Sequence, residues 1–211
     1  RLIGRGFWTS WRRAQGLPGD TIWDIHRDRR GRLWVATDKG LCRATTQGWR
    51  VLSGTEKAST RRIHEDARGR LWISLMPAAI LLYDPAENRI VRYSKASGVI
   101  GTQIISLEED GEGNIWAASE GAGLLRYRPE QNNFVTEAVP EGAPEETFLC
   151  LLQDSKGRLW AAGEHGLLLR DKGKWTRFKK RDGLLHDHVS HIAELRSGDL
   201  CLSYFEPLGF I

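Results

Sequence analysis

The densest group of side chains that could do chemistry is a run of three histidines, His186, His188 and His191, in the segment HDHVSH. Glu164 and His165 precede them in the segment GEHG. Imidazole nitrogens bind divalent metals, and alternate residues of an extended segment share one side. A metal site of His165, His186 and His188 is therefore one hypothesis. We favour the alternative, a polar solvated loop without metal, because His191 takes the opposite face once a strand has begun.

Other catalytic signatures do not occur in the sequence. It has no Ser-His-Asp order, no phosphate-cradling glycine motif and no zinc-binding helix motif, and its glycines are typical of turns. We therefore expect no cofactor. The net charge is +4, but the basic residues are scattered or paired in turn-like segments, which indicates solvated loops rather than nucleic-acid binding.

The elements that must position these residues follow an internal repeat. The sequence DRRGRLW begins at Asp28 and recurs as DARGRLW, DGEGNIW and DSKGRLW from Asp66, Asp110 and Asp154, with a degraded fifth copy from Leu195. Successive anchor positions are about 38 to 44 residues apart, a period typical of β-propeller blades. The anchors are Trp34, Trp72, Trp116, Trp160 and Cys201. We therefore predict an all-β propeller of four-stranded antiparallel blades, five in this chain.

The repeat also predicts the organisation of the chain as a single domain over residues 1–211. We expect blades at about 21–55, 60–95, 103–138, 147–180, and 189–211 combined with 1–12. The last blade is composite because GFWTSWRRAQGLPGD, from Gly6, aligns without gaps on GKWTRFKKRDGLLHD, from Gly173. A closed five-bladed ring and a segment of a larger propeller both remain open. Because the chain opens on Arg1 rather than Met, we expect a processed or excised piece.

Within a blade, short strands alternate with turns. In the first blade we expect strands at Thr21–Arg27, Arg32–Ala36, Leu41–Ala44 and Trp49–Leu52. The innermost strands are mostly apolar, which predicts packing on both faces. No apolar run approaches the length of a membrane span.

Aromatic and sulfur side chains are mostly assigned to the core by their place in the repeat. Residues that recur at one position of every blade pack blade against blade, which accounts for the anchor tryptophans and for Trp8, Trp49, Trp175 and Phe134. Trp11 corresponds to Phe178 and is expected to be structural, and His26 and His64 to pack and hydrogen-bond. The three cysteines replace apolar residues of the repeat and lack metal-ligand spacing, so we expect buried free thiols at Cys42, Cys150 and Cys201.

Residues that depart from the repeat are better functional candidates, because function in a propeller lies on loops displayed by a rigid scaffold. One face should gather the loops between second and third strands with the segments that enter each inner strand. Trp23 belongs to an inner strand and could line the central channel. Arg61 and Arg62 begin another inner strand and could bind an anion, although solvation or pairing with Glu65 is the plainer interpretation for both. The ligand-binding candidates are Trp23, Asp38, Lys39, Arg61, Glu120, Glu164, His165, Asp187 and His188, with Asp20 on the same face.

The repeat IHRDRRGRLWVATDKGLCR, preceded by GLPGDTIWDI, resembles the two-component regulator propeller repeat. The resemblance covers four full repeats and weakly the fifth. It implies a periplasmic sensor region of a membrane-anchored hybrid histidine kinase, diguanylate cyclase or transcriptional regulator. Members typically carry more repeats, an immunoglobulin-like domain and a membrane helix, none of which follows the repeats in this sequence.

The function expected from this resemblance is a non-enzymatic, ligand-sensing or interaction propeller that works with the remainder of a sensor protein. The ligand would be a small molecule or a glycan, and the signal would pass through changed domain packing. Two alternatives remain. One is a metal-dependent, streptogramin-lyase-like propeller enzyme that uses Glu164, His165 and His188. The other is a pure protein-interaction scaffold, which could form a homodimer through an unclosed sheet edge.

Overall fold

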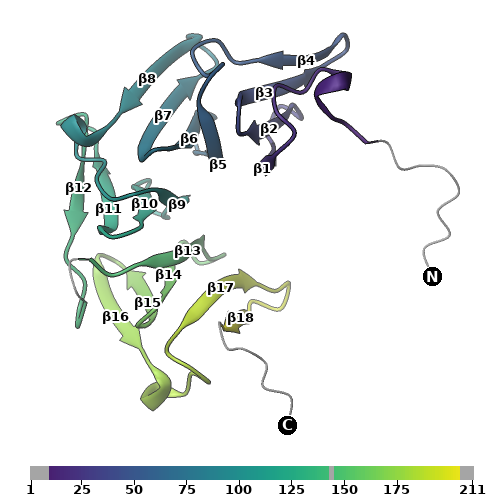
Figure 1. Ribbon diagram of the computed structural model, residues 1–211. Coiled ribbons are helices and arrows are strands. Elements are labelled where there is room, and N and C mark those ends of the chain that lie inside the picture. Colours follow the sequence, from purple (N-terminus) through teal and green to yellow (C-terminus); the bar gives the residue numbers. More distant parts are fainter. Residues whose placement is uncertain (1–9, 143–144, 205–211) are drawn as a thin grey trace, which may run out of the picture. The chain divides into compact units, whose positions relative to one another are not determined.

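The computed structural model describes residues 10–142 and 145–204, and these residues form strands and short 3₁₀ turns (Figure 1). The chain divides into two compact units, Arg1–Arg61 and Arg62–Ile211. Each unit is described by itself below. Among the described residues, no helix has the length and apolar character needed to cross a membrane.

The first unit contains one complete four-stranded antiparallel sheet in the order β1-β2-β3-β4. Its strands begin and end within two residues of the predicted bounds, because the Asp-x-x-Gly turn and the loop before Gly40 determine where each strand stops. The elements are η1 (Arg13–Gln15), β1 (Ile22–Arg27), β2 (Leu33–Thr37), β3 (Gly40–Thr45) and β4 (Gly48–Val51). Leu17, Val35 and Cys42 form the core of this unit.

The next strand, β5 (Ser59–Glu65), crosses the boundary between the units and begins the second sheet, β5-β6-β7-β8. Two further four-stranded sheets and a two-stranded sheet, β17-β18, follow. The remaining strands of the second, third, fourth and last sheets are β6 (Leu71–Met76), β7 (Ala79–Asp84) and β8 (Arg89–Tyr93); β9 (Ile104–Glu109), β10 (Ile115–Ser119), β11 (Gly123–Arg128) and β12 (Asn133–Glu137); β13 (Phe148–Gln153), β14 (Leu159–Gly163), β15 (Gly166–Asp171) and β16 (Lys174–Phe178); and β17 (Val189–Glu194) and β18 (Leu200–Tyr204). The 3₁₀ turns η2 (Lys95–Ser97) and η3 (Lys180–Asp182) precede β9 and β17. The predicted all-β architecture of four-stranded antiparallel blades is confirmed.

The anchor tryptophans pack one sheet against the next, as their place in the repeat predicts. Within the second unit, Trp72 shares a core cluster with residues of β9 to β12, and Trp116 shares one with residues of β13 to β15. Trp160 does the same with Val189 and Ile192 of β17. Trp34, in the first unit, is also buried. These clusters bury large aromatic surfaces between blades, which contributes hydrophobic stabilisation.

The aspartate of each repeat holds its turn and its tryptophan together. Oδ1 of Asp66 accepts hydrogen bonds from the backbone N–H groups of Arg68 and Arg70, at 3.0 and 2.9 Å. Oδ2 accepts bonds from Nε of Arg70 at 2.8 Å and from the indole N–H of Trp72 at 2.9 Å. Burial acts to raise the pKa of the Asp66 carboxyl, but these hydrogen bonds outweigh burial and leave that pKa below its usual value.

The same arrangement recurs in two other turns. Asp28 and Asp154 accept equivalent bonds from their own turns and from Trp34 and Trp160. Burial again acts to raise each aspartate pKa, and the hydrogen bonds again lower it overall. The motif D-x-x-G-R-L-W is therefore explained by a buried carboxylate that needs every one of these donors.

Two predictions about burial were wrong. The inner strand β1 is largely exposed rather than packed on both faces, with Ile25 63% exposed. Cys201 is exposed, because β18 has no described strand paired along its outer edge, and Cys150 on β13 is only partly buried. Trp11, which was expected to be structural, packs edge-on against Trp49 at 5.8 Å and is 52% exposed. The predicted free thiols and the burial of Cys42 agree with the structure.

Some of the sequence-based predictions concern residues that the structure does not describe. Trp8 and most of the residues expected to complete the fifth blade, 1–9 and 205–211, lie outside the described residues. The composite blade, and with it the number of blades in the native ring, therefore remains a prediction.

Candidate functional site

The candidate residues lie on two kinds of connection, the loop between the second and third strands and the segment that enters the inner strand. These two connections lie side by side in the first, third and fourth blades. In the first unit, Asp38 N–H donates to the carbonyl of Thr21 at 3.2 Å. In the second unit, Glu120 N–H donates to the carbonyl of Gln103 at 2.9 Å, and Glu164 N–H to that of Thr147 at 3.3 Å. The loop between second and third strands therefore lies against the segment that enters the inner strand, as predicted. We call these two kinds of connection the loop face of their blade.

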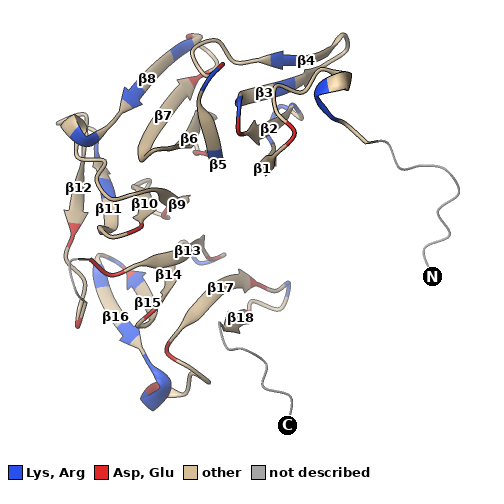
Figure 2. Cartoon of the chain, in the orientation of Figure 1, with Lys and Arg blue, Asp and Glu red and all other residues tan. Residues whose placement is uncertain are grey.

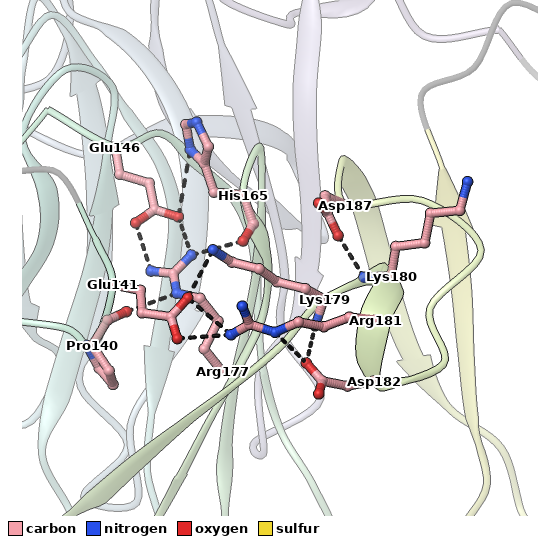
Figure 3. A network of polar contacts seen from close by, with 10 residues as sticks. All are labelled: Pro140, Glu141, Glu146, His165, Arg177, Lys179, Lys180, Arg181, Asp182 and Asp187. Atoms are coloured by element: carbon pink, nitrogen blue, oxygen red, sulfur yellow. Dashed lines mark hydrogen bonds and ion pairs between the residues drawn. The ribbon is translucent and has the colours of Figure 1, made fainter.

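The loop face of the fourth blade is built around a buried ion pair between Glu146 and Arg177 (Figure 3). The Arg177 guanidinium donates to both carboxylate oxygens, at 2.6 and 2.7 Å, and both side chains are almost fully buried. Arg177 also donates to the carbonyls of Pro140 and His165, at 2.8 and 2.9 Å. One side chain of β16 thus binds the connection before β13 and the loop between β14 and β15.

A second, exposed layer of charge covers this pair. The Glu141 carboxylate accepts from Lys179 at 2.9 Å and from Arg181 at 2.8 Å (Figure 3). Hydrogen bonds from Lys179 and Arg181 hold the pKa of Glu141 below its usual value. Figure 2 shows the basic residues gathered on β16 and η3. The result is a polar surface of charged groups that pair with one another close to the buried pair.

Glu146 and Arg177 are absent from the sequence-based candidates, although a signal for each existed. Glu146 occupies the repeat position of Asp20 and Asp187, which were singled out. Arg177 replaces an apolar residue, since its equivalent in the first blade is Val51. A basic residue at a repeat position that is apolar in another blade, together with an acidic residue at a repeat position that is acidic in other blades, indicates an ion pair. Only the folded structure shows that the two side chains meet.

The predicted residues of this face have different surroundings. His165 lies beside the pair, with Nδ1 3.8 Å from Oε1 of Glu146, and is exposed (Figure 3). Glu164 is exposed. Asp187 accepts a bond from the backbone N–H of Lys180 at 2.5 Å and so stabilises the turn η3. Asp20 does the same for Arg13 in the first unit, at 2.9 Å. The two aspartates are therefore part of the loop framework.

The remaining histidines do not converge with His165. Nδ1 of His186 accepts from the backbone N–H of His188 at 3.0 Å, which folds the HDH segment on itself. Across residues 10–142 and 145–204, no three His, Cys, Asp or Glu side chains form a group that could hold a metal ion. Glu120, on the third blade, accepts a short hydrogen bond from the hydroxyl of Thr102.

In the first unit, Lys39 Nζ lies 3.9 Å from the carboxylate of Asp38. Oδ1 of Asp38 is hidden from solvent and makes no hydrogen bond with a described residue. A Cβ on Gly19 would lie 2.0 Å from that oxygen, so a glycine is required where this chain segment passes. Trp23 and Arg61, predicted separately, are stacked, with the guanidinium carbon 3.5 Å from the centre of the indole ring.

The inner strands of the second unit carry another polar group. Nε of Arg62 donates to the carbonyl of Ile105 at 3.0 Å, so Arg62 joins two adjacent blades rather than pairing with an acid. Next to it, Nδ1 of His64 lies 3.5 Å from Oε1 of Glu108. Burial raises the pKa of the Glu108 carboxyl to about 7. Burial also raises the pKa of the neighbouring Cys150 thiol.

Taken together, these groups can bind polar or charged ligands by hydrogen bonds and ion pairs on a preformed surface. The fold and this loop face define the class: the chain is a β-propeller of four-stranded blades. Two segments, residues 16–39 and 142–165, match the family model described as two component regulator propeller. The chain therefore carries two-component regulator propeller repeats, as the sequence motif indicated.

Solved structures support the same fold. The extracellular domain of BT3049 from B. thetaiotaomicron, described as a hybrid two component system, has a TM-score of 0.73 and 22% identity over 88% of this chain and 26% of that one. The extracellular domain of BT4673 from the same organism, described as a one component system, has a TM-score of 0.52 and 20% identity over 91% and 34%. The chain thus spans roughly a quarter to a third of these domains.

A third similar structure is an enzyme. A catalytically inactive virginiamycin B lyase from Staphylococcus aureus, with quinupristin, has a TM-score of 0.68 and 14% identity over 87% of this chain and 63% of the lyase. A comparison with curated protein sequences finds no match. At these identities, the structural similarities establish the fold alone.

Proposed function

We propose that this chain is a non-enzymatic sensor propeller from the extracytoplasmic region of a bacterial signalling protein, where it binds a small molecule or glycan on its loop face. The observation that carries the proposal is the match of residues 16–39 and 142–165 to the two-component regulator propeller model. Similarity to the extracellular domains of BT3049 and BT4673 supports the same assignment.

The loop face of the fourth blade supports a binding role. Its basic and acidic side chains lie near a buried ion pair that holds two connections in place. A rigid surface loses little conformational entropy when a ligand binds, which favours recognition. The bound ligand would then alter how the propeller packs against the remainder of the sensor protein, and that change would carry the signal.

The competing function is the lyase reaction, which the similarity to virginiamycin B lyase favours. Glu164, His165 and His188 would carry out this reaction, yet the His165 ring lies 3.8 Å from a carboxylate, that of Glu146, which Arg177 already pairs. This arrangement supports the binding role, because the Glu146 carboxylate is engaged in holding loops.

Equilibrium dialysis against a pooled library of sugars, organic acids and peptides, followed by mass spectrometry, tests the proposal. We expect the 211-residue chain to retain at least one compound and to release it chemically unchanged. Quinupristin with Mg²⁺ is included in a parallel incubation, and we expect its ring to stay closed. Retention of nothing, or conversion of a retained compound or of quinupristin, would overturn the proposal.

A further inference from the structure

Among the residues that the structure describes, Arg61 has an aromatic partner but no acidic one. Its guanidinium carbon lies 3.5 Å from the centre of the Trp23 ring. The side chain is partly buried, and its Nε is hidden from solvent without a hydrogen-bond partner among the described residues. Trp23 itself stays 41% exposed. Both residues belong to the first unit, on the inner strands β1 and β5.

Three other buried or partly buried arginines differ from Arg61 in having a carboxylate partner, whereas Arg128 resembles Arg61 in having a buried Nε without a hydrogen-bond partner among the described residues. Arg70 pairs with Asp66, Arg170 with Asp110 and Arg177 with Glu146. A guanidinium removed from water is costly unless an anion satisfies its charge and its N–H groups. Arg61 therefore lacks the kind of group that the fold supplies elsewhere.

Packing does not require an arginine at this position. The third and fourth blades have Ile105 and Leu149 at the equivalent place in the repeat. A residue that breaks the repeat, and that gains no ion pair by doing so, is expected at a functional position.

The stacked geometry suits one kind of ligand. A guanidinium that lies over an indole ring keeps its N–H edge available in the plane, where it can form two parallel hydrogen bonds to a carboxylate. Stacking also fixes the orientation of the group before binding, which lowers the entropic cost. Trp23 is 41% exposed, so its ring can also contact a flat or apolar body.

We propose that Arg61 and Trp23 form a carboxylate-binding site that accepts a small molecule with a flat or apolar body. Arg61 would bind the carboxylate in a bidentate manner, and Trp23 would hold the guanidinium in place and pack against the rest of the molecule. This inference rests on the proposed sensor function and defines the charge of the ligand that this part of the propeller recognises.

Benzoate and its neutral counterpart benzamide test the site by titration of the ¹⁵N-labelled full chain, observed at the indole N–H resonance of Trp23. That resonance is assigned by its loss in Trp23→Phe. We expect benzoate to shift it saturably and benzamide to leave it unchanged. Arg61→Leu, which introduces the residue found at position 149, should weaken benzoate binding by about tenfold or more. Arg61→Lys should weaken binding less, because it keeps the charge but loses the planar fork.

Arg89→Leu is the matched control, since Arg89 is an exposed strand arginine and its replacement changes the net charge equally. We expect it to bind benzoate like the unmodified chain, and circular dichroism establishes that every variant is folded. The inference is overturned if benzoate does not bind, if benzamide binds as tightly, or if Arg61→Leu and Arg89→Leu bind alike. A compound retained in dialysis equally by Arg61→Leu would sustain the sensor function and refute this site.

Discussion

Arg170 of β15 donates a hydrogen bond from Nη1 to Oδ2 of Asp110, at 2.9 Å, and so joins the fourth blade to the turn of the third. Among the four full repeats, the third turn is the one that lacks the arginine and has Asn114 in its place. Asn114 still bonds to Asp110, but it brings no charge. Arg170 supplies that charge from the neighbouring blade, and it also stacks over Trp116 at 5.2 Å.

Replacing Arg170 by Met should therefore destabilise the protein strongly, because the buried Asp110 carboxylate loses its cationic partner. We expect a loss of about 3 kcal/mol in the free energy of unfolding, measured by urea denaturation. Arg89→Met, at an exposed ion pair, should change it by less than about 0.5 kcal/mol. Adding Asn114→Arg to the Arg170→Met variant restores the arginine of the other turns and should recover part of the loss. Equal stability of the two single variants would contradict this interpretation.

The same turn requires a glycine at position 111, where the neighbouring blade comes close. Gly111 N–H donates to the carbonyl of Gly157 at 2.9 Å, and a Cβ at position 111 would lie 2.5 Å from that oxygen. Gly111→Ala must push the two turns apart, and we expect a cost of about 1–3 kcal/mol in thermal or urea unfolding. Ala67→Ser changes the equivalent, exposed position of the second turn and should be nearly neutral. A neutral Gly111→Ala would show that the turns do not touch.

Glu108 should make stability depend on pH near neutrality. Burial raises its pKa to about 7 in the folded protein, above the ordinary value of 4.5. A raised acid pKa means that the folded state holds the proton more tightly, so stability is greatest below pH 4.5 and falls as the pH rises to about 7. We expect this fall to reach about 2–3 kcal/mol. Urea denaturation at pH 5 and pH 8 measures it, and Glu108→Gln should flatten the profile; an unchanged profile in that variant would assign the effect to other groups.

The buried ion pair between Glu146 and Arg177 is expected to hold the loop-face connections in place, and substitutions of its two residues test this role. Arg177→Val leaves the Glu146 carboxylate buried without its partner and should cost about 3–5 kcal/mol in unfolding free energy. The double variant Arg177→Val with Glu146→Ala introduces the residues found at the equivalent positions of the first and second blades, Val51 and Ala58 respectively, and should recover most of that loss.

If the pair only stabilised the fold, the double variant would also bind retained ligands normally. We expect weakened binding in both variants instead, because Arg177 positions the connections at Pro140 and His165. Full binding by the stable double variant would contradict a positioning role.

The blades could be predicted from the sequence because the residues within each turn determine its conformation. Asp28 and Gly31 determine the first turn by local interactions, and Trp34 occupies a repeat position that is buried in every full repeat. The ion pairs could not be predicted in this way, since Arg170 and Arg177 find partners in other connections that only the packing of blades brings near. Trp23 and Arg61 were both identified as departures from the repeat, but their stacking depends on the positions of two separate strands. Exposure of β1 was missed because apolar composition alone does not reveal which faces a neighbour covers.

Hydrogen–deuterium exchange of the 211-residue chain, with and without a compound retained in dialysis, tests the central claim that ligand binds on the loop face and adjoining inner strands. We expect protection in peptides from the connections before β9, β13 and β17, from the loop at 163–166, and from β1 and the start of β5. Protection confined to the outer strands β4, β8, β12 and β16, or to the turns that follow the inner strands, would contradict the account.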